Sequence, residues 1–508
     1  MKVLFFSINN IATPHFETEL ELMSDHLEKG DEVFVLRCNK NLERCYSNPE
    51  HLKSTCFSCG LRFDIGMKRV GISKDNIFGL NEKIKLKDFP ESFKNLDELK
   101  NFKVYDVRLG FGVFSYLVSE LRSHKFDVNA YKTKILKTLR SSILVYESVY
   151  EFLKKINVDT VYLFNGRFFD LWPVVKVCEQ LNVNYYVYEK GADALRYFLS
   201  KNCLPHDLSY VKRDIIQHWD EPNDSKINKY DIGRSLFINK KKREDKVFWI
   251  TRFDALRSYV KNQTKDLLPL DFDKTKTNIV IFNSSIDEYE AFEEYKNPVY
   301  RDDYDSLINI LESFKQREDI KFYLRIHPNL KGLDNNQMQE LKKLESLGYK
   351  NLTTIWPEDK VDSYALLDNC DKSISFISTM LVEATFWGKP AILIGHAFFE
   401  GLDCCYRPKS HKEVIELIDA KLEPKRKEEA IKYGYWLITF GIKYKKFKPT
   451  QRFMGDFLGR SLWSDIKLKD KLKLKFLIVK DMGVKRALRW QLTKNARKIQ
   501  DIKSRILN

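Results

Sequence analysis

The chain has 508 residues, of which 43% are apolar and 31% are charged. This composition is typical of a globular protein with a sizeable core, and it excludes a wholly disordered or collagen-like chain. The length fits two or three domains. No run approaches the roughly 20 apolar residues of a membrane-spanning helix. The short apolar run at residues 3–8 fits a buried strand better than a secretory signal, so we expect a cytoplasmic protein.

The positive charge is concentrated near the C-terminus. The chain carries 87 basic and 71 acidic residues, a formal net charge of +16. Residues 461–508 hold 14 Lys or Arg and 4 Asp or Glu, so this segment alone carries +10 and the rest of the chain only +6. A nucleic-acid-binding protein usually spreads its basic residues over its folded domains, so we expect no nucleic-acid partner.

The basic tail has an amphipathic pattern. Between Ile466 and Phe476, Lys alternates with Leu at the period of a strand, yet the same segment also fits a helix with one apolar stripe, formed by Leu468, Leu472, Phe476 and Val479. Residues 484–506 fit a second helix with basic flanks. A basic amphipathic helix can lie on an anionic membrane, which would place the protein at the inner face of a membrane. Packing on the protein itself or on a partner protein is the alternative.

The first half of the chain opens with a β-loop-α-β pattern. Strands are predicted over 3–8 and 33–37, with a helix over 16–29 between them. The loop lacks G-x-G-x-x-G, so a dinucleotide cofactor is not indicated. A long helix is predicted over 131–156, then a second βαβ unit over 160–188. Residues 200–260 are expected to be mostly helical.

From residue 278 onward, predicted strands and helices alternate. The strands are 278–283, 321–326, 353–356, 372–376 and 391–394, and the helices are 304–315, 336–347, 362–367 and 379–387. Such alternation predicts a parallel, doubly wound sheet. We therefore expect an α/β protein with two Rossmann-like domains facing a cleft, and we place the boundary in the polar segment 261–276. The expected domains are residues 1–265 and 266–450, with the basic tail at 451–508.

Ligands of doubly wound sheets bind beyond the carboxyl ends of the strands. Two predicted loops of this kind carry phosphate-binding chemistry. Ser284 and Ser285 follow the strand 278–283, and hydroxyl and backbone N–H groups at such a turn can hold a phosphate. Arg325 and His327 end the next strand and can donate to phosphate oxygens. An ordinary capped turn and a structural histidine are the alternatives.

A third loop follows the strand 372–376. Ser378 and Thr379 begin a helix there, so free N–H groups and the helix dipole are expected to point beyond the sheet. Glu383, just over one turn later, could accept both hydroxyls of a ribose. A capped helix with a solvated Glu is the alternative. The three loops together predict a nucleotide-sugar site, and its donor-binding residues would be Ser284, Ser285, Arg325, His327, Ser378, Thr379 and Glu383.

The first domain supplies candidates for the acceptor side. Asn165 and Arg167 follow one predicted strand and could orient an acceptor hydroxyl or a donor phosphate. A general base must approach the attacking hydroxyl, and the catalytic candidates are His15, Glu17 and Glu189. The sequence does not choose among these three.

Four of the nine cysteines cluster as C-x6-C-x10-C-x2-C, at Cys38, Cys45, Cys56 and Cys59. Disulfides are rare in cytosolic proteins, and four thiols with a terminal C-x-x-C are compatible with a structural zinc site. Free thiols and a redox role are the alternatives.

Several motifs resemble those of bacterial surface-polysaccharide glycosyltransferases, especially capsule-biosynthesis proteins related to Kdo transferases and, more remotely, glycerophosphotransferases of teichoic-acid synthesis. The resemblance covers about 278–420 and extends in part over 1–200. Its motifs are 325–328 (RIHP), 361–367 (VDSYALL), the Ser378–Ala384 segment and 387–390 (WGKP). The early cysteine cluster and 165–167 (NGR) also look like patterns of such proteins.

This resemblance implies the two-domain GT-B architecture and no catalytic metal. It also implies that His327 and the Ser378–Thr379 turn hold the donor phosphate and that Glu383 holds the nucleotide. One departure is Lys190, where these relatives suggest Arg. We therefore expect a glycosyltransferase that uses an NDP- or CMP-linked sugar and a lipid-linked or growing glycan. A polyol-phosphate transferase, a nucleotide-sugar epimerase and a non-catalytic scaffold of the polysaccharide machinery are the alternatives.

Overall fold

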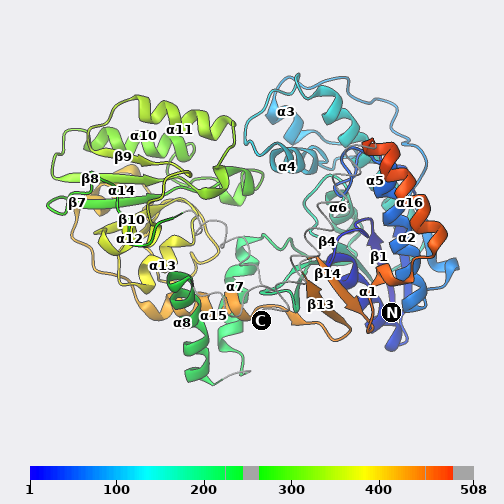
Figure 1. Cartoon of the computed structure of the whole chain (residues 1–508). Helices are drawn as coiled ribbons and strands as arrows, with labels where there is room; N and C mark the ends of the chain where they lie inside the picture. Colours follow the sequence, from blue (N-terminus) through cyan, green and yellow to red (C-terminus); the bar gives the residue numbers. More distant parts are fainter. Residues whose placement is uncertain (223–224, 244–262, 452, 484–508) are drawn as a thin grey trace. The chain divides into compact units, whose positions relative to one another are not determined.

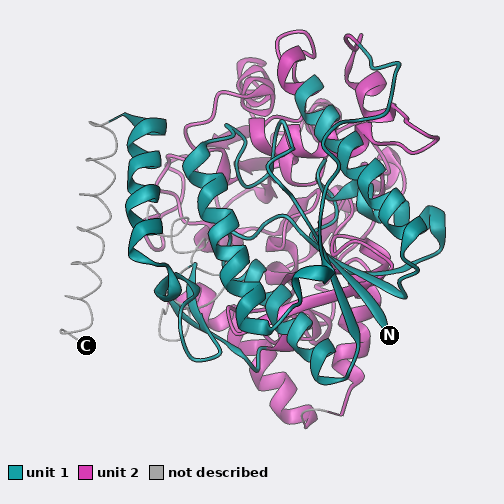
Figure 2. Ribbon diagram, turned by 90° about the vertical axis from the view of Figure 1, so that its right-hand side faces the viewer, with its two compact units in different colours: residues 1–90, 136–186, 444–508 teal, residues 91–135, 187–443 magenta. Residues whose placement is uncertain are grey.

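The computed structural model of the chain describes residues 1–222, 225–243, 263–451 and 453–483 (Figure 1). The chain divides into two compact units (Figure 2). Unit 1 comprises residues 1–90, 136–186 and 444–508, and unit 2 comprises 91–135 and 187–443. This partition differs from the continuous domains expected from the sequence, and the polar segment 261–276 lies inside unit 2.

Unit 1 is built on parallel strands. Strand β1 (Lys2–Ser7) pairs in parallel with β2 (Glu32–Arg37) and with β4 (Thr160–Phe164). Val3, Leu4 and Phe5 of β1 are fully buried, because a central parallel strand is covered on both faces. The sheet that contains these strands has the order β12-β6-β5-β4-β1-β2-β3. The predicted β-loop-α-β opening is therefore present, and α1 (His15–Glu28) is its helix.

The N-terminal half also contains the further strands of this sheet and several helices. They are α2 (Lys53–Val70), η1 (Lys74–Asn76), β3 (Ile77–Gly79), α3 (Leu96–Asn101), α4 (Gly110–Leu121), α5 (Lys132–Lys155), α6 (Trp172–Leu181), β5 (Asn184–Lys190), β6 (Arg196–Lys201), α7 (Leu208–Asp220) and α8 (Lys226–Lys242). Helices α7 and α8 agree with the helical character expected for 200–260, of which residues 244–262 lie outside the described residues.

Unit 2 contains a five-stranded parallel sheet with the order β11-β10-β7-β8-β9. Its strands are β7 (Thr277–Phe282), β8 (Ile320–Arg325), β9 (Leu352–Ile355), β10 (Lys372–Ser375) and β11 (Ala391–Leu393). The helices of this half are α10 (Asp303–Phe314), α11 (Asn336–Ser346), α12 (Ser363–Asn369), α13 (Met380–Phe386), α14 (His411–Asp419) and α15 (Lys427–Thr439). Short 3-10 turns occupy η2 (Ile286–Glu288), η3 (Glu293–Tyr295) and η4 (Pro328–Leu330).

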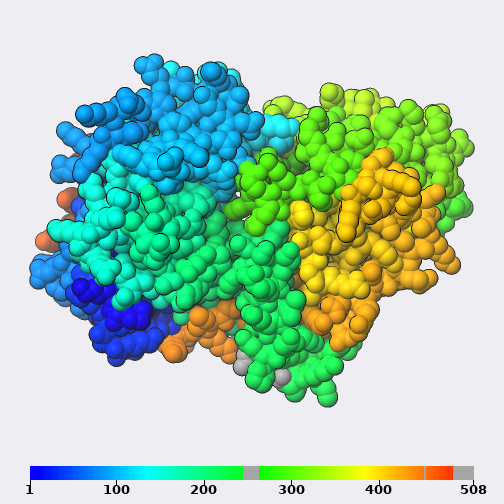
Figure 3. Space-filling view, turned by 180° about the vertical axis from the view of Figure 1, so that it is seen from behind, coloured from blue at the N-terminus to red at the C-terminus, as the bar shows by residue number. Residues whose placement is uncertain are grey.

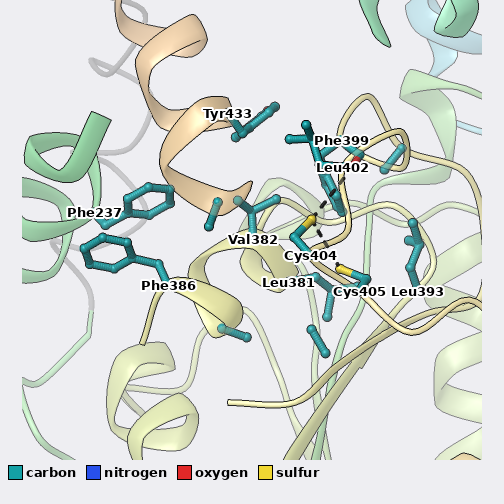
Figure 4. Close-up of a cluster of buried hydrophobic side chains, with 14 of the residues drawn as sticks. Phe237, Leu381, Val382, Phe386, Leu393, Phe399, Leu402, Cys404, Cys405 and Tyr433 are labelled. Atoms are coloured by element: carbon teal, nitrogen blue, oxygen red, sulfur yellow. Dashed lines mark hydrogen bonds between the residues drawn. The ribbon is translucent and has the colours of Figure 1, made fainter. Parts of the chain in front are cut away.

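Alternate residues of each strand face two separate cores of unit 2. Ile279 and Ile281 pack with apolar residues of α10, α11 and α14. Val280 and Phe282 belong to the cluster that includes residues of α13 and α15, part of which is drawn in Figure 4. The space-filling view shows the surface of these elements from behind, coloured from green to orange along the chain (Figure 3). Helices on both faces of a parallel sheet make this a doubly wound α/β fold, as expected from the alternation.

The segment after residue 443 returns to unit 1. It forms β13 (Phe447–Gln451), β14 (Met454–Phe457), η5 (Leu462–Asp465) and α16 (Leu468–Met482), and the short strand β12 (Ile442–Lys443) precedes it. Helix α16 lies beside α2 (Figures 1 and 2). Of the two readings of residues 466–476, the strand is wrong and the helix is right. The second predicted tail helix, over 484–506, lies outside the described residues.

Candidate functional site

The three loops singled out in the second half follow three adjacent strands of the unit 2 sheet, β10, β7 and β8. Their tips are joined by direct contacts. The Ser375 hydroxyl donates to the Phe282 carbonyl at 2.6 Å, and the Asn283 N–H donates to the Arg325 carbonyl at 3.1 Å. The backbone N–H of Ser378 in turn donates to the Ser375 hydroxyl at 3.0 Å. The sheet therefore brings all three loops to one edge.

The two serines after β7 have different surroundings. Ser285 is buried, donates to Asp287 Oδ1 at 2.5 Å and accepts from Arg122 at 3.3 Å. Ser284 is 5% exposed, and its hydroxyl has no hydrogen-bond partner within the described part of the chain. A buried hydroxyl without a hydrogen-bond partner destabilises the folded protein by about 1–3 kcal/mol. A ligand that hydrogen-bonds to Ser284 would therefore recover this free energy.

Arg122, at the C-terminal end of α4, is a cation that the sequence did not single out. Its Nε lies 2.6 Å from Asp287 Oδ2, and its guanidinium also donates to the Asn329 carbonyl at 3.4 Å. It approaches His327 closely enough to lower the pKa of that imidazole. Arg122 precedes the sheet by more than 150 residues in the chain, so no local pattern pointed to it.

His327 is a neutral hydrogen-bond donor rather than a cation. Burial lowers the pKa of His327 to about 4, and Arg122 and Arg325 act in the same direction. The backbone N–H of Asn329 donates to Nδ1 at 3.2 Å. Nδ1 is thus the acceptor and Nε2 carries the proton. The backbone N–H of His327 donates to Asn283 Oδ1 at 3.4 Å, and this hydrogen bond links the loops after β7 and β8.

Arg325 lies beneath this site rather than on its surface. It is 3% exposed and donates to the Trp356 carbonyl at 2.8 Å. Burial lowers the pKa of Arg325 to about 10, so the guanidinium stays charged at neutral pH. Arg325 can therefore contribute positive potential to the strand ends, while its hydrogen bond to Trp356 fixes the neighbouring loop.

The loop after β10 ends at the start of α13. Ser378 is half-buried and its hydroxyl accepts from the Met380 N–H at 3.3 Å, which caps the helix. Thr379 is exposed, occupies the N-cap position with helical dihedrals and makes no side-chain cap hydrogen bond. The hydroxyl of Ser378 thus bonds to the first turn of the helix, whereas exposed Thr379 makes no such bond.

Glu383 is not a solvated carboxylate. It is 3% exposed, accepts from the Lys240 ammonium at 2.8 Å and from the Tyr364 hydroxyl at 2.5 Å. Burial, and then the charge of Glu383, raise the pKa of Tyr364 well above its usual range. A ribose diol could bind Glu383 only by exchanging with one of these partners. Lys240, from α8, is a second cation that the sequence analysis missed.

A fourth strand end carries an additional histidine. His396 follows β11, and its Nδ1 lies 2.9 Å from Glu400, which also pairs with Lys212 at 2.7 Å. Gly395 is required here because a Cβ would lie 2.0 Å from the carbonyl oxygen of Phe376. His396 comes two residues after the strand predicted at 391–394, so the sequence held a signal for it.

Two Asp-x-Asp triplets occur in unit 2, and both serve structural contacts. Asp271 pairs with Lys321 at 3.0 Å, and Asp273 accepts from the Thr275 hydroxyl at 2.6 Å. Asp303 is buried and accepts from the Tyr289 hydroxyl at 2.7 Å.

In unit 1, His15 and Glu17 begin α1. His15 is half-buried and its ring lies 4.0 Å from that of Phe164. Glu17 is 1% exposed, forms an ion pair with the equally buried Arg62 and accepts from the Thr13 hydroxyl at 3.2 Å. Burial raises the pKa of Glu17, although Arg62 opposes the shift. This is the environment of a structural ion pair, whereas His15 is the more accessible of the two.

The remaining acceptor-side candidates lie at the ends of β4 and β5. Asn165 is buried with φ at 54°, and its side chain accepts from the Arg167 N–H at 3.3 Å. The Arg167 guanidinium lies 4.6 Å from the centre of the Phe168 ring. Glu189 is half-buried and accepts from the Lys190 N–H at 3.0 Å. Asn165 and Arg167 therefore share one turn of unit 1.

The four clustered cysteines line one cavity of unit 1, about 290 Å³ in volume. Burial raises the pKa of the Cys38 and Cys45 thiols, and raises that of Cys59 to about 11. The Cys56 thiol accepts from the Asn48 amide at 3.2 Å. Within the described ranges, no three His, Cys, Asp or Glu side chains are arranged to hold a metal ion. Structural zinc at these thiols stays a prediction.

None of the described helices has both the length and the apolar character needed to cross a membrane.

No known protein-family profile matches the chain. No curated protein sequence matches it either. Solved structures with a similar arrangement include two of KpsC from Thermosulfurimonas dismutans. The beta Kdo 2,4 transferase is 12% identical with a TM-score of 0.33, over 55% of this chain and 79% of that one. The beta Kdo 2,7 transferase is 15% identical with a TM-score of 0.30, over 57% and 80%.

A third similar structure is the UDP-GlcNAc 2-epimerase of Methanocaldococcus jannaschii in complex with UDP-GlcNAc and UDP. It is 12% identical with a TM-score of 0.27, over 85% of this chain and 98% of that one. The similar structures thus include both Kdo transferases and epimerases.

Proposed function

We propose that this protein is a glycosyltransferase that takes a sugar from a nucleotide-linked donor, held by unit 2, and transfers it to a growing or lipid-linked surface glycan. The observation that carries the proposal is the convergence of three polar loops at the adjacent ends of β10, β7 and β8. In doubly wound sheets this edge is where nucleotides bind.

The donor phosphates would lie between the loops after β7 and β8. His327 would donate its Nε2–H to a phosphate oxygen, and the buried Ser284 hydroxyl would supply a second donor. Arg122 would add positive charge beside them. Negative charge grows on the phosphate as the sugar leaves, so fixed donors at this point lower the barrier.

The nucleoside would lie toward Glu383. When a ribose arrives, its hydroxyls would replace the ammonium of Lys240 or the hydroxyl of Tyr364 on the carboxylate. The released Lys240 would then be available to a phosphate. For the general base, half-buried His15 and Glu189 suit an incoming hydroxyl better than Glu17, because the partner of Glu17 is buried Arg62.

Product analysis with purified protein tests the proposal. The protein is incubated with CMP-, UDP-, GDP- or dTDP-linked sugars and a membrane glycan extract, with and without EDTA. A transferase releases the nucleotide only when acceptor is present and adds the bare sugar to the glycan, and we expect EDTA to have no effect. An epimerase alters the sugar nucleotide without acceptor, and a polyol-phosphate transferase leaves phosphate in the product.

Two variants and one control connect the activity to the site. His327→Ala and Glu383→Gln are expected to abolish most of the release, whereas His411→Ala, on the exposed start of α14, should leave it unchanged. Equal release by all three variants and the wild type would contradict the proposed site, whereas no release by the wild type would favour a scaffold. Alteration of the sugar nucleotide in the absence of acceptor would replace it with the epimerase.

A further inference from the structure

Helix α16 presents an apolar stripe to solvent. Leu468, Leu472, Phe476 and Val479 are 73%, 58%, 67% and 39% exposed. Because successive residues of an α-helix are about 100° apart, these four side chains fall within about 80° of one another around the helix axis. Side chains of this size are normally buried, and a contiguous exposed row of them marks an interaction surface.

The opposite face of α16 holds the helix on its own protein. Leu474, Leu477 and Ile478 are half-buried on that side, where α16 lies beside α2. Asp481 accepts from the Ser54 N–H near the start of α2 at 2.7 Å. The stripe therefore faces away from α2, which already occupies the other side of the helix.

The charges of α16 are sorted in the same way. Its two acidic residues, Asp470 and Asp481, share the face that contacts α2. Lys471 and Lys475 flank the stripe on one side and Lys469 and Lys480 flank it on the other, whereas the ammonium of Lys473 lies 4.9 Å from the centre of the Phe57 ring of α2. A row of large apolar side chains between two rows of lysines complements a surface that is apolar within and anionic at its rim.

From this arrangement we propose that α16 is a docking element for an anionic lipid bilayer, with the stripe inserted among the lipid chains and the lysines against the headgroups. The charge pattern favours a bilayer over a protein partner, because a protein groove would need acidic residues along both edges. Each lysine near an anionic surface strengthens binding by about fivefold. This inference does not rest on the proposed function, since it concerns only unit 1.

Vesicle flotation of the full chain tests the proposal. The vesicles are phosphatidylcholine alone, or phosphatidylcholine with about a third phosphatidylglycerol. We expect the wild-type protein to float with the anionic vesicles only, and to be released by high salt. The variant Leu472→Ser/Phe476→Ser should bind at least tenfold more weakly, and Lys469→Glu/Lys471→Glu/Lys475→Glu should not bind.

Matched controls use exposed residues of unit 2. Leu347→Ser removes a half-exposed leucine. Lys342→Glu/Lys343→Glu reverses the charge of two exposed side chains of α11. Neither variant should change flotation. All substituted side chains are exposed, so we expect unchanged melting temperatures and unchanged nucleotide binding.

Four results would overturn the inference. One is undiminished flotation of the stripe variant, and another is equal binding to neutral vesicles. A third is loss of all binding on truncation after Gly483, which would assign the membrane contact to residues 484–508. The fourth is a wild-type dimer in light scattering that the stripe variant converts to monomer, which would make the stripe a contact between copies of the chain.

Discussion

In the proposed donor site, His327 is a neutral hydrogen-bond donor, and its neutrality predicts how nucleotide-sugar affinity depends on pH. Because burial lowers the pKa of His327 to about 4, the imidazole has no charge to lose between pH 6 and pH 8. We expect the affinity for a nucleotide sugar, whose phosphate diester does not titrate in this range, to change by less than about twofold. An imidazole with an ordinary pKa near 6.5 would lose its charge, and with it much of the affinity, over the same interval.

Isothermal titration at pH 6, 7 and 8 measures this dependence. His327→Ala should weaken binding by about tenfold or more, since a hydrogen bond to a charged group contributes about 1.5–3 kcal/mol. The control is His411→Ala. A tenfold fall in wild-type affinity from pH 6 to pH 8 would show that His327 acts as a cation.

Asp303 gives a second pH-dependent prediction, on stability. It is buried against Tyr289, and burial raises the pKa of Asp303 from 3.8 to about 7. The folded protein thus holds this proton more tightly than the unfolded chain. The stabilisation is complete below about pH 4 and is lost as the pH rises toward 7. We expect the melting temperature of the wild type to fall more between pH 5 and pH 8 than that of Asp303→Asn, by a few degrees. Parallel curves for the two proteins would contradict the prediction.

The raised pKa values of the clustered thiols predict slow alkylation. Burial raises the pKa of Cys38, Cys45 and Cys59, so little thiolate is present at neutral pH. We expect alkylation by iodoacetamide at pH 7.5 to be at least tenfold slower in the native protein than in urea, as read by mass spectrometry. Rapid native labelling would contradict this prediction.

Metal analysis of the same sample tests the zinc prediction. Less than about a tenth of an equivalent of zinc per chain would exclude it.

Residue-scale partners were the least predictable part of the site. The sequence pointed to Glu383, but its partner Lys240 is 143 residues earlier in the chain. Likewise, nothing in the loop after β7 indicated that Arg122 would pair with Asp287. Spacing rules describe neighbours along one helix or strand, whereas these pairs form only after distant helices pack. The positions of the strand ends could therefore be predicted, but their cationic partners Arg122 and Lys240 could not.

Among the elements, the contact of α8 with α15 positions Lys240. A Cβ at Gly233 would lie 2.4 Å from the carbonyl oxygen of Ile431, and one at Gly434 would lie 2.5 Å from that of Gly233. We expect Gly233→Ala to force the two helices apart, to destabilise the protein by about 1–3 kcal/mol in urea unfolding, and to weaken nucleotide binding by displacing Lys240.

Gly60, in α2, is the matched control. A Cβ there would be 3.6 Å from Arg37, an ordinary contact. Gly60→Ala should be neutral or stabilising by up to about 1 kcal/mol, because alanine favours a helix. Equal effects of the two substitutions would show that the close approach of α8 and α15 is not what Gly233 provides.

Most elements follow from apolar patterns that are bounded by loops. The strand predicted at 160–164 is β4 without change, and the one at 372–376 differs from β10 by one residue. The tail could not be assigned in the same way. Alternating Lys and Leu fits both a strand and a helix, and packing of Leu474, Leu477 and Ile478 beside α2 accompanies the helix.

At the scale of the whole molecule, the doubly wound sheets could be predicted but the division of the chain could not. Unit 1 takes segments from the start, the middle and the end of the chain. The return of residues 444–483 is fixed by contacts such as Lys446 with Asp25, at 2.5 Å, and Arg69 with the Ser461 carbonyl, at 3.1 Å. A change in composition shows where a chain becomes polar. It does not show that a later segment packs against the unit formed by the start of the chain.

The central claim is that adjacent strand ends of unit 2 bind the nucleotide of an activated sugar. A thermal-shift screen of the full chain with CMP, CDP, UDP, GDP and dTDP measures this directly. A ligand at 100 times its dissociation constant stabilises a folded protein by about 2.7 kcal/mol. We predict that at least one nucleotide raises the melting temperature of the wild type and of His411→Ala by several degrees, and that neither His327→Ala nor Glu383→Gln responds at the same concentration. No shift with any nucleotide, or equal shifts in all four proteins, would contradict the account.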